Sequence, residues 1–168
     1  MEVTIRPYRD SDLRQFRWLY ERTPPAGQVA YEPQPWPEHL DHIYDHHAAF
    51  WLAIHSDGER EGLVGSIGLE HVGAQSVAPP VPDFIDTTPP TVRVHEMRAA
   101  PEVQRQGIGR QLLDVALDWS RAHGYEWVIL DTTPQQEAAV AFYKAMGFED
   151  VGRSMIDRWE LVWFRRHL

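Results

Sequence analysis

Two periodicities of hydrophobic and polar residues run along this chain, and together they predict an ordered series of strands and helices. Two-residue alternation and short apolar runs predict strands at Val3–Tyr8, Phe50–His55, Leu63–His71, Val92–Ala99, Trp127–Leu130, Glu149–Met155 and Arg158–Phe164. A three- and four-residue period predicts helices from Asp10 or Ser11 to Arg22 and at Glu38–Ala48, Gly107–His123 and Gln135–Met146. Proline-rich stretches at residues 23–37 and 77–90 predict loops.

This order of elements indicates a mixed α/β or α+β sheet with helices on both faces. The chain has 168 residues, which is the size of one ordinary domain, and it shows neither an internal repeat nor a linker. We therefore expect a single domain over residues 1–168.

Composition and charge restrict the possible partners. The formal net charge is −9, which argues against nucleic acid as a partner, because phosphate backbones are bound by clustered Lys and Arg. An acidic surface suits a cationic substrate such as an amine, although it also serves solubility. No apolar run approaches the ~20 residues of a membrane span. The chain has no cysteine, which excludes disulfides and thiolate chemistry and fits a cytoplasmic protein.

A glycine-rich turn, QRQGIGR at residues 104–110, joins a predicted strand to a predicted helix. The backbone amides from Arg105 to Arg110 lie at the start of that helix, where unpaired N–H groups favour a pyrophosphate. A dinucleotide fingerprint would need a third glycine where this chain has Leu112, and the Gly-Lys-Ser/Thr end of a P-loop is absent. A turn that only lets strand and helix pack remains the alternative.

Two motifs in this chain resemble those of the GNAT N-acetyltransferase superfamily. The segment MRAAPEVQRQGIGRQLLDVALDWSRAHG, residues 97–124, is similar to the family's acyl-CoA-binding motif. Further on, AAVAFYKAMGF matches the family pattern A-x-x-x-Y-x-x-x-G-F, and TIRPYRDSDL looks like the usual first strand and helix cap. One position departs from the pattern: Gln136 stands where the family often has Asn.

The resemblance implies a sheet of about seven strands in which the fourth and fifth strands splay apart. It implies that acetyl-CoA is the acyl donor and that its pantetheine arm pairs with the backbone near Met97 and Ala99. A backbone N–H there would polarise the thioester carbonyl. The implied donor-binding residues are Met97, Arg98, Ala99, Gln104, Arg105, Gln106, Gly107, Ile108, Gly109, Arg110, Gln136 and Phe142.

Transfer to an amine requires a group that removes a proton from the nucleophile. Glu96 is the first candidate, because it stands mid-strand near the implied thioester, and His95 is the second. Neighbours on a regular strand point to opposite faces, so only one of them should enter the site unless a bulge intervenes. The alternative for Glu96 is a surface charge paired with Arg98 or Arg93. Asp131 is a third candidate, with a turn carboxylate as its alternative.

The departing thiolate requires a proton or a hydrogen bond. Tyr143 stands where the family places its phenol donor, and its alternative role is that of an aromatic side chain that packs the helix, which the neighbouring Phe142 could also fill. For the acceptor side, Tyr31, Trp36 and Asp131 are candidate contacts. His42 and His46 are four residues apart on a predicted helix, but no set of ligands is evident, and we predict no metal.

We therefore predict an acetyl-CoA-dependent N-acetyltransferase that moves an acetyl group directly to a primary amine of a small molecule in a ternary complex. Two alternatives remain. The acceptor could be a peptide or protein amine, or the chain could be a non-catalytic module that senses acyl-CoA. The sequence leaves monomer and homodimer open.

Overall fold

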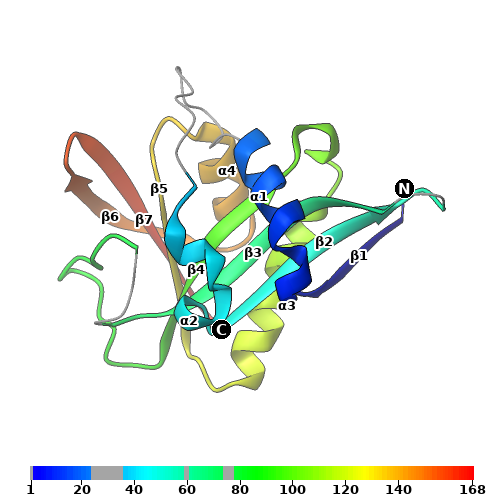
Figure 1. Ribbon diagram of the computed structural model, residues 1–168. Helices are drawn as coiled ribbons and strands as arrows, with labels where there is room; N and C mark the ends of the chain where they lie inside the picture. The colour runs from blue at the N-terminus through cyan, green and yellow to red at the C-terminus, as the bar shows by residue number, and fades with distance from the viewer. Residues whose placement is uncertain (1, 24–35, 59–60, 74–77) are drawn as a thin grey trace.

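The computed structural model describes residues 2–23, 36–58, 61–73 and 78–168 and contains a seven-stranded mixed sheet. The strands follow the order β1-β2-β3-β4-β5-β7-β6, and only β4 and β5 are parallel neighbours. Their bounds are β1 Glu2–Pro7, β2 Ala49–Ser56, β3 Glu61–His71, β4 Thr91–Ala99, β5 Trp127–Thr132, β6 Glu149–Ile156 and β7 Trp159–His167. This architecture confirms the mixed α/β sheet of about seven strands (Figure 1).

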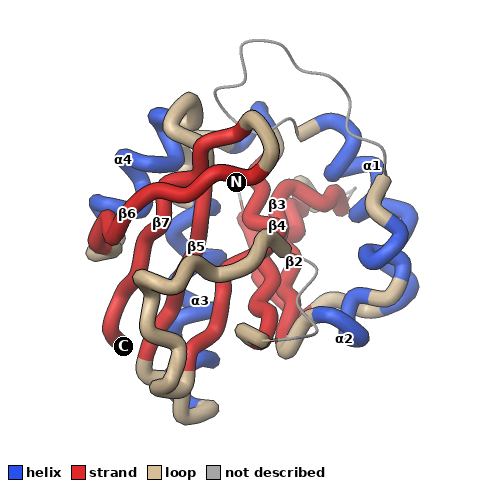
Figure 2. The backbone as a smooth tube through the Cα atoms, turned by 90° about the vertical axis from the view of Figure 1, so that its left-hand side faces the viewer, coloured by secondary structure: helices blue, strands red, loops and turns tan. Residues whose placement is uncertain are grey.

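Helices lie on both faces of the sheet. The helical elements are η1 Asp10–Asp12, α1 Leu13–Arg22, η2 Glu38–Asp41, α2 Ile43–His46, η3 Pro101–Val103, α3 Ile108–Ala122 and α4 Glu137–Ala145, where η marks a 3₁₀ turn. Figures 1 and 2 show α1 and α2 on one face and α3 and α4 on the other. We call these the α1 face and the α3 face.

The apolar stripes that predicted the helices are the surfaces that they bury. On α3 the buried side chains are Ile108, Leu112, Leu113, Ala116 and Leu117, which recur at three- and four-residue spacing. They join the main core together with Val92 of β4 and Val128 of β5. The helix stops next to Gly124, whose φ of +79° lies in the left-handed region that glycine adopts without strain.

The prediction of one helix over Glu38–Ala48 was wrong. Two short turns, η2 and α2, replace it, and His42 between them has an extended φ of −130° with ψ of 70°. Leu40 and Ile43 are both buried, one from each turn. The backbone leaves the helical region at His42 and interrupts the helix, so His42 and His46 do not lie on one face of a single helix.

Candidate functional site

The fourth and fifth strands part soon after they begin. β4 pairs with β5 only through Thr91–Arg93, which face Trp127–Ile129. The first four residues of β4 are buried, whereas the next five, from His95 to Ala99, are partly exposed. Within the described part of the chain, the divergence therefore leaves one edge of β4 without a neighbouring strand, at the position where the sequence resemblance predicted it.

A β-bulge in this open half of β4 changes the direction of its side chains. Between His95 and Arg98 the strand contains one residue more than the facing stretch of β3. Glu96 takes up the irregularity with a φ of +51°, a strained value for a residue with a β-carbon. The buried hydroxyl of Ser66 on β3 donates a 2.9 Å hydrogen bond to the carbonyl oxygen of Glu96. As a result His95 Nε2 and Glu96 Oε1 are 3.7 Å apart instead of pointing to opposite faces.

The carboxylate of Glu96 is anchored through one oxygen. Arg98 Nε donates to Glu96 Oε2 at 2.9 Å, and Arg98 itself is fixed by a 2.9 Å bond from Nη1 to the carbonyl of Thr23 and by its position 3.9 Å above the ring of Tyr20. Burial raises the pKa of Glu96, but the positive charge of Arg98 and its hydrogen bond more than offset this, so the pKa lies below its ordinary value. Glu96 is therefore ionised at neutral pH, with Oε1 turned towards His95.

A chain of two hydrogen bonds determines the tautomer of His95. His47 Nδ1 lies 2.9 Å from the carbonyl oxygen of Ile43, which can only accept, so this nitrogen carries a proton. Burial lowers the pKa of His47, which is therefore neutral, and its Nε2 accepts the 3.0 Å hydrogen bond from His95 Nδ1. Burial likewise lowers the pKa of His95 to about 4. Neutral His95 thus has a lone pair on Nε2, the atom nearest Glu96.

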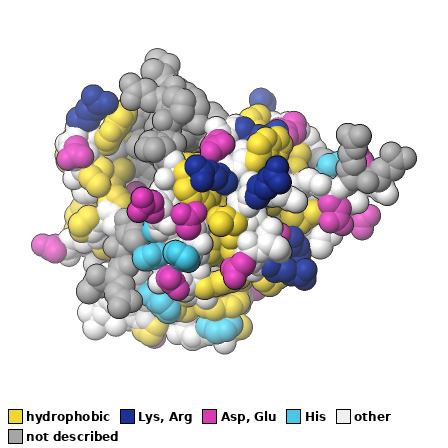
Figure 3. All heavy atoms as spheres, viewed as in Figure 1, with side chains coloured by type: hydrophobic (Ala, Val, Ile, Leu, Met, Phe, Trp, Pro, Cys, Tyr) yellow, Lys and Arg dark blue, Asp and Glu magenta, His cyan; other side chains and the backbone are white. Residues whose placement is uncertain are grey.

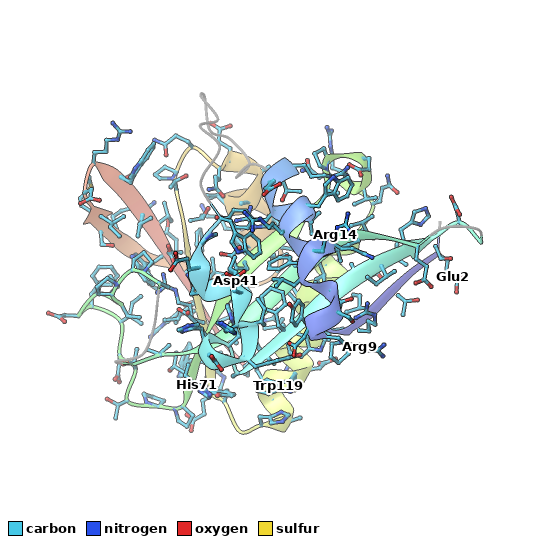
Figure 4. The ribbon with its side chains drawn as sticks, viewed as in Figure 1. Glu2, Arg9, Arg14, Asp41, His71 and Trp119 are labelled. Atoms are coloured by element: carbon cyan, nitrogen blue, oxygen red, sulfur yellow. The ribbon has the colours of Figure 1, made fainter. Side chains whose placement is uncertain are left out.

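Three side chains of metal-binding types lie close together at this point on the α1 face. One atom each from His39 of η2, His95 and Glu96 lie within 4.8 Å of one another. The ring of His39 stacks on that of His95 with centroids 6.0 Å apart, and its Nε2 has no hydrogen-bonding partner among the residues that the structure describes. Histidine and acidic side chains gather in the middle of this face in Figure 3, and Figure 4 shows Asp41 of η2 in front of the sheet. Two imidazoles and a carboxylate this close together can share a cation once the His39 ring turns out of its stack on His95.

On the α3 face the parted strands hold a different set of side chains. The hydroxyl of Tyr143 on α4 donates to the sulfur of Met97 at 3.4 Å. Burial raises the pKa of Tyr143, so the phenol stays protonated. The ring of Phe142 lies 5.3 Å from that of Tyr143, and both Phe142 and Met97 approach Gly109 of α3. The phenol is thus a proton donor beside the open part of β4.

The glycine-rich turn presents its backbone to solvent. Gly107 is the N-cap of α3 with a φ of +84°, and nothing described lies within 4 Å of the place where its β-carbon would be. Arg105 also has a positive φ, of 60°. The first-turn amides of α3 have no partner within the helix, as at any helix start. These features favour binding of an anion at this end of α3.

The side chains around the turn differ in their surroundings. Gln104 Nε2 donates to the carbonyl of Ala99 at 3.3 Å, and Gln106 Nε2 donates to that of Glu102 at 2.9 Å. Arg110 is exposed, 3.9 Å from Asp114. By contrast, the side chain of Ile108 is buried in the core, so this residue can offer a ligand only its backbone.

The carboxylate of Asp131 is paired with a buried arginine. It forms an ion pair with Arg93, whose side chain is 2% exposed and which also donates to the carbonyl of Pro79 at 2.6 Å. The guanidinium lies 4.8 Å from the ring of Trp163. Removing a partner from a buried charge is costly, so this carboxylate stabilises the point at which β4 and β5 separate.

The other predicted contacts are placed as follows. Gln136 is the N-cap of α4, and its Oε1 accepts a 2.9 Å hydrogen bond from Thr132 Oγ1. Trp36 packs edge to face against Tyr20 of α1, and its Nε1 donates to Asp41 at 2.9 Å, so it lies in an aromatic cluster. Tyr31 falls outside the described residues.

Sequence reasoning did not connect three residues to this site, namely His39, His47 and Ser66. The first two were visible only as members of a histidine-rich segment, and His47 meets His95 across 48 positions of sequence. Nothing in the local pattern signalled these contacts, because each depends on how β3, β4 and η2 pack. In the part of the chain that the structure describes, no helix is long and apolar enough to cross a membrane.

A model of the acetyltransferase (GNAT) family matches residues 13–148 of this chain. Human N-acetyltransferase 8 is 29% identical over 144 residues, which cover 75% of this chain and 55% of the relative. N-alpha-acetyltransferase RimI of Mycobacterium tuberculosis is 34% identical over 100 residues, 58% of this chain and 54% of the relative. The chain thus spans about half the length of these curated relatives. Arabidopsis thaliana NAA60 in complex with a bisubstrate analogue has the same fold, with a TM-score of 0.75 at 20% identity over 99% of both chains.

Proposed function

The chain belongs to the GNAT acetyltransferase family, and from that premise we propose that it transfers the acetyl group of acetyl-CoA directly to a primary amine within a ternary complex. The observation that carries this proposal is the pair formed by ionised Glu96 and neutral His95 beside the unpaired edge of β4. A carboxylate and a lone pair directed at one point suit the nitrogen of an amine, which arrives as an ammonium ion and must lose a proton before it reacts.

The donor binds, in this proposal, along the open edge of β4 and across the start of α3. The pyrophosphate accepts hydrogen bonds from the amides of residues 105–110, with Arg105 and Arg110 adding positive charge. The pantetheine arm pairs with the backbone between Met97 and Ala99. Gln104, Gln106, Gln136 and Phe142 complete the predicted donor-binding set together with Arg98, Gly107, Ile108 and Gly109. The solvent-facing backbone at Gly107 and its positive φ support this placement.

The acetyl transfer divides between the two faces of β4. Glu96 Oε1 accepts a proton from the ammonium, and the freed nitrogen attacks the thioester carbonyl carbon. The second proton of that nitrogen passes to His95 Nε2 as the carbon–nitrogen bond forms. As the carbon–nitrogen bond forms and the carbon–sulfur bond breaks, Tyr143 donates a proton or a hydrogen bond to the departing sulfur. His95 presents its Nε2 lone pair to the same amine and is held in that tautomer by His47. The protein orients both substrates, which supplies much of the rate.

The acceptor that we propose is a small-molecule primary amine. The net charge of −9 and the histidine and acidic side chains that gather in the middle of the α1 face support a cationic substrate. A second candidate is the α-amine of a peptide or protein, which is favoured by the similarity to a protein named N-alpha-acetyltransferase RimI. We further propose a single domain over residues 1–168, in the cytoplasm on the strength of its lack of cysteine, as a monomer or homodimer.

Turnover in the presence of acetyl-CoA tests the function. A panel of small amines and of peptides with free N-termini, with N-acetylated peptides as blanks, would identify the acceptor class through release of CoA thiol. Glu96→Gln should lower kcat/KM by roughly 10²–10³-fold, within the range of general-base effects. Glu160→Gln, an exposed carboxamide substitution on β7, is the matched control and should leave the rate unchanged.

Binding without turnover would overturn the enzymatic proposal. If acetyl-CoA raises the midpoint of thermal unfolding but no amine or peptide is acetylated, the acyl-CoA sensor is the better description. A full rate in Glu96→Gln would remove this residue as the base while leaving the transferase intact.

A further inference from the structure

The two imidazoles and one carboxylate that lie together on the α1 face could bind a metal ion as well as an amine. We propose that His39, His95 and Glu96 bind a divalent transition metal ion, with Zn²⁺ as the ion that fits best. The ion is not a cofactor of acetyl transfer in this proposal. It occupies the place of the acceptor ammonium and blocks it.

The spacing of the donor atoms is close to what such an ion needs. Zinc binds imidazole nitrogen and carboxylate oxygen at about 2.0–2.2 Å, which sets tetrahedral ligands roughly 3.4 Å apart. His95 Nε2 and Glu96 Oε1 are already 3.7 Å apart, and one atom of His39 lies within 4.8 Å of the other two ligands. Closure therefore requires a shift of up to about 1.4 Å and a rotation of the His39 ring out of its stack on His95. Both changes fall on His39 in a four-residue 3₁₀ turn rather than on the two residues of the sheet.

The donor types select the class of metal. Two imidazoles and one carboxylate leave a fourth position open, which is the ligand set of many accessible zinc sites. Imidazole nitrogens suit Zn²⁺, Cu²⁺ and Ni²⁺, whereas Mg²⁺ and Ca²⁺ take oxygen ligands. We therefore expect the site to ignore magnesium and calcium.

The groups behind the ligands are arranged as in metal sites. His95 donates its other ring N–H to His47, which fixes the ring and directs Nε2 at the ion. Glu96 has Oε2 held by Arg98, which leaves Oε1 to coordinate. The positive charge of Arg98 also repels a cation, so we expect reversible binding that a chelator readily removes.

An ion at this position has a consequence that rests on the proposed function. It takes Glu96 Oε1 and His95 Nε2, the atoms that receive the amine, but it leaves the turn around Gly107 free. Zinc should therefore inhibit competitively against the amine and not against acetyl-CoA, and EDTA should restore the rate.

Equilibrium dialysis of the purified full chain against zinc chloride, with the bound metal measured by mass spectrometry, tests the site without any reference to activity. The wild type should bind a single zinc ion per chain, and Mg²⁺ in excess should not displace it. His39→Ala should weaken zinc binding by at least about a hundredfold, since losing a metal-orienting partner alone costs 10–100-fold. His42→Ala, an exposed histidine three positions further along, is the matched control and should bind as the wild type does.

Two results would overturn the proposal: no zinc bound by the wild type, or equal zinc affinity in His39→Ala and wild type. Thermal unfolding of His39→Ala, together with a visible absorption titration of Co²⁺ in the wild type, separates loss of the site from loss of the fold. Co²⁺ must give tetrahedral bands that disappear on addition of zinc.

Measuring zinc inhibition at varied concentrations of the amine and of acetyl-CoA tests the metal site separately from the proposed function. Zinc binding that depends on His39 but inhibits competitively against acetyl-CoA would keep the metal site and refute the placement of the amine. A working transferase that binds no zinc would refute the metal site alone.

Discussion

Replacing Tyr143 by Phe separates a catalytic phenol from a packing aromatic, because only the catalytic role predicts a large loss of rate when the ring is kept. The substitution keeps the ring that contacts Phe148 and Phe164 and removes only the hydroxyl. That hydroxyl donates to Met97 Sδ at 3.4 Å, and a thioether is a weak acceptor. Since an ordinary hydrogen bond contributes about 0.5–1.5 kcal/mol net, the free energy of unfolding should fall by less than about 1 kcal/mol.

The rate should respond far more strongly than stability. Loss of a general acid lowers kcat by roughly 10²–10⁴-fold. The raised pKa keeps the phenol of Tyr143 protonated throughout the usable pH range, so the defect should be the same from mildly acidic to alkaline pH. The assay is release of CoA thiol from acetyl-CoA, run beside thermal unfolding, where a loss of 1 kcal/mol corresponds to about 2–4 °C for a chain of this size.

Tyr125→Phe is the matched control, because it also removes a phenol hydroxyl, here one 2.9 Å from His71 Nδ1. It should leave kcat unchanged. A Tyr143→Phe enzyme that retains kcat within about threefold of the wild type would refute the acid role, since general acids contribute at least about a hundredfold. Retained kcat together with little change in stability would identify Tyr143 as a packing residue, because phenylalanine keeps the ring contacts.

Three further predictions follow from other parts of the structure. Gly107→Ala should cost about 1 kcal/mol, because its φ is +84°, and should weaken acetyl-CoA binding by calorimetry; unchanged affinity would mean that the donor does not lie over this turn. Ser66→Ala should cost about 1–2 kcal/mol, because it leaves the carbonyl of Glu96 unpaired, and should lower kcat more than it changes KM for acetyl-CoA; equal unfolding midpoints would contradict the supporting role of this bond. The pKa of Asp12 is lowered by its hydrogen bonds with Arg6, so their stabilisation is full above about pH 4–5 and is lost as the pH falls through the folded-state pKa; urea unfolding of Asp12→Asn should show a deficit of about 1–2 kcal/mol at pH 7 that vanishes in acid.

Elements whose signal is local could be predicted from the sequence. The helix over Ile108–Ala122 follows from apolar spacing, and its start follows from glycine at a position that adopts a positive φ. The separation of β4 from β5 is a property of the whole fold, and it was predicted from the resemblance to the family rather than from local sequence patterns. The helix expected over Glu38–Ala48 was wrong because the backbone leaves the helical region at His42 and divides the segment into two short turns.

The constellation around Glu96 could not be predicted, because it depends on contacts between distant residues. The bulge needs Ser66, 30 positions earlier, and the tautomer of His95 needs His47 and the carbonyl of Ile43. A strand pattern with a period of two predicts that His95 and Glu96 point to opposite faces, and only the register between β3 and β4 shows that they do not. The sequence thus identified both residues as alternatives, whereas the structure makes them neighbours.

The ion pair between Arg93 and Asp131, at the point where β4 and β5 stop pairing, also determines the length of the open edge of β4. Arg93 is the last residue of β4 that faces β5, and its buried guanidinium reaches across to Asp131 on the other strand. Separating the strands further would take a buried cation away from one of the two carboxylates that pair with it, Asp131 and Glu70, so the open edge is limited to the residues from Val94 to Ala99. At about 3.3 Å per residue this edge measures roughly 20 Å. In the proposed donor complex, an extended arm that pairs with β4 would therefore stop at a defined depth, and the reacting end of the donor would reach the same point on the strand in every catalytic cycle.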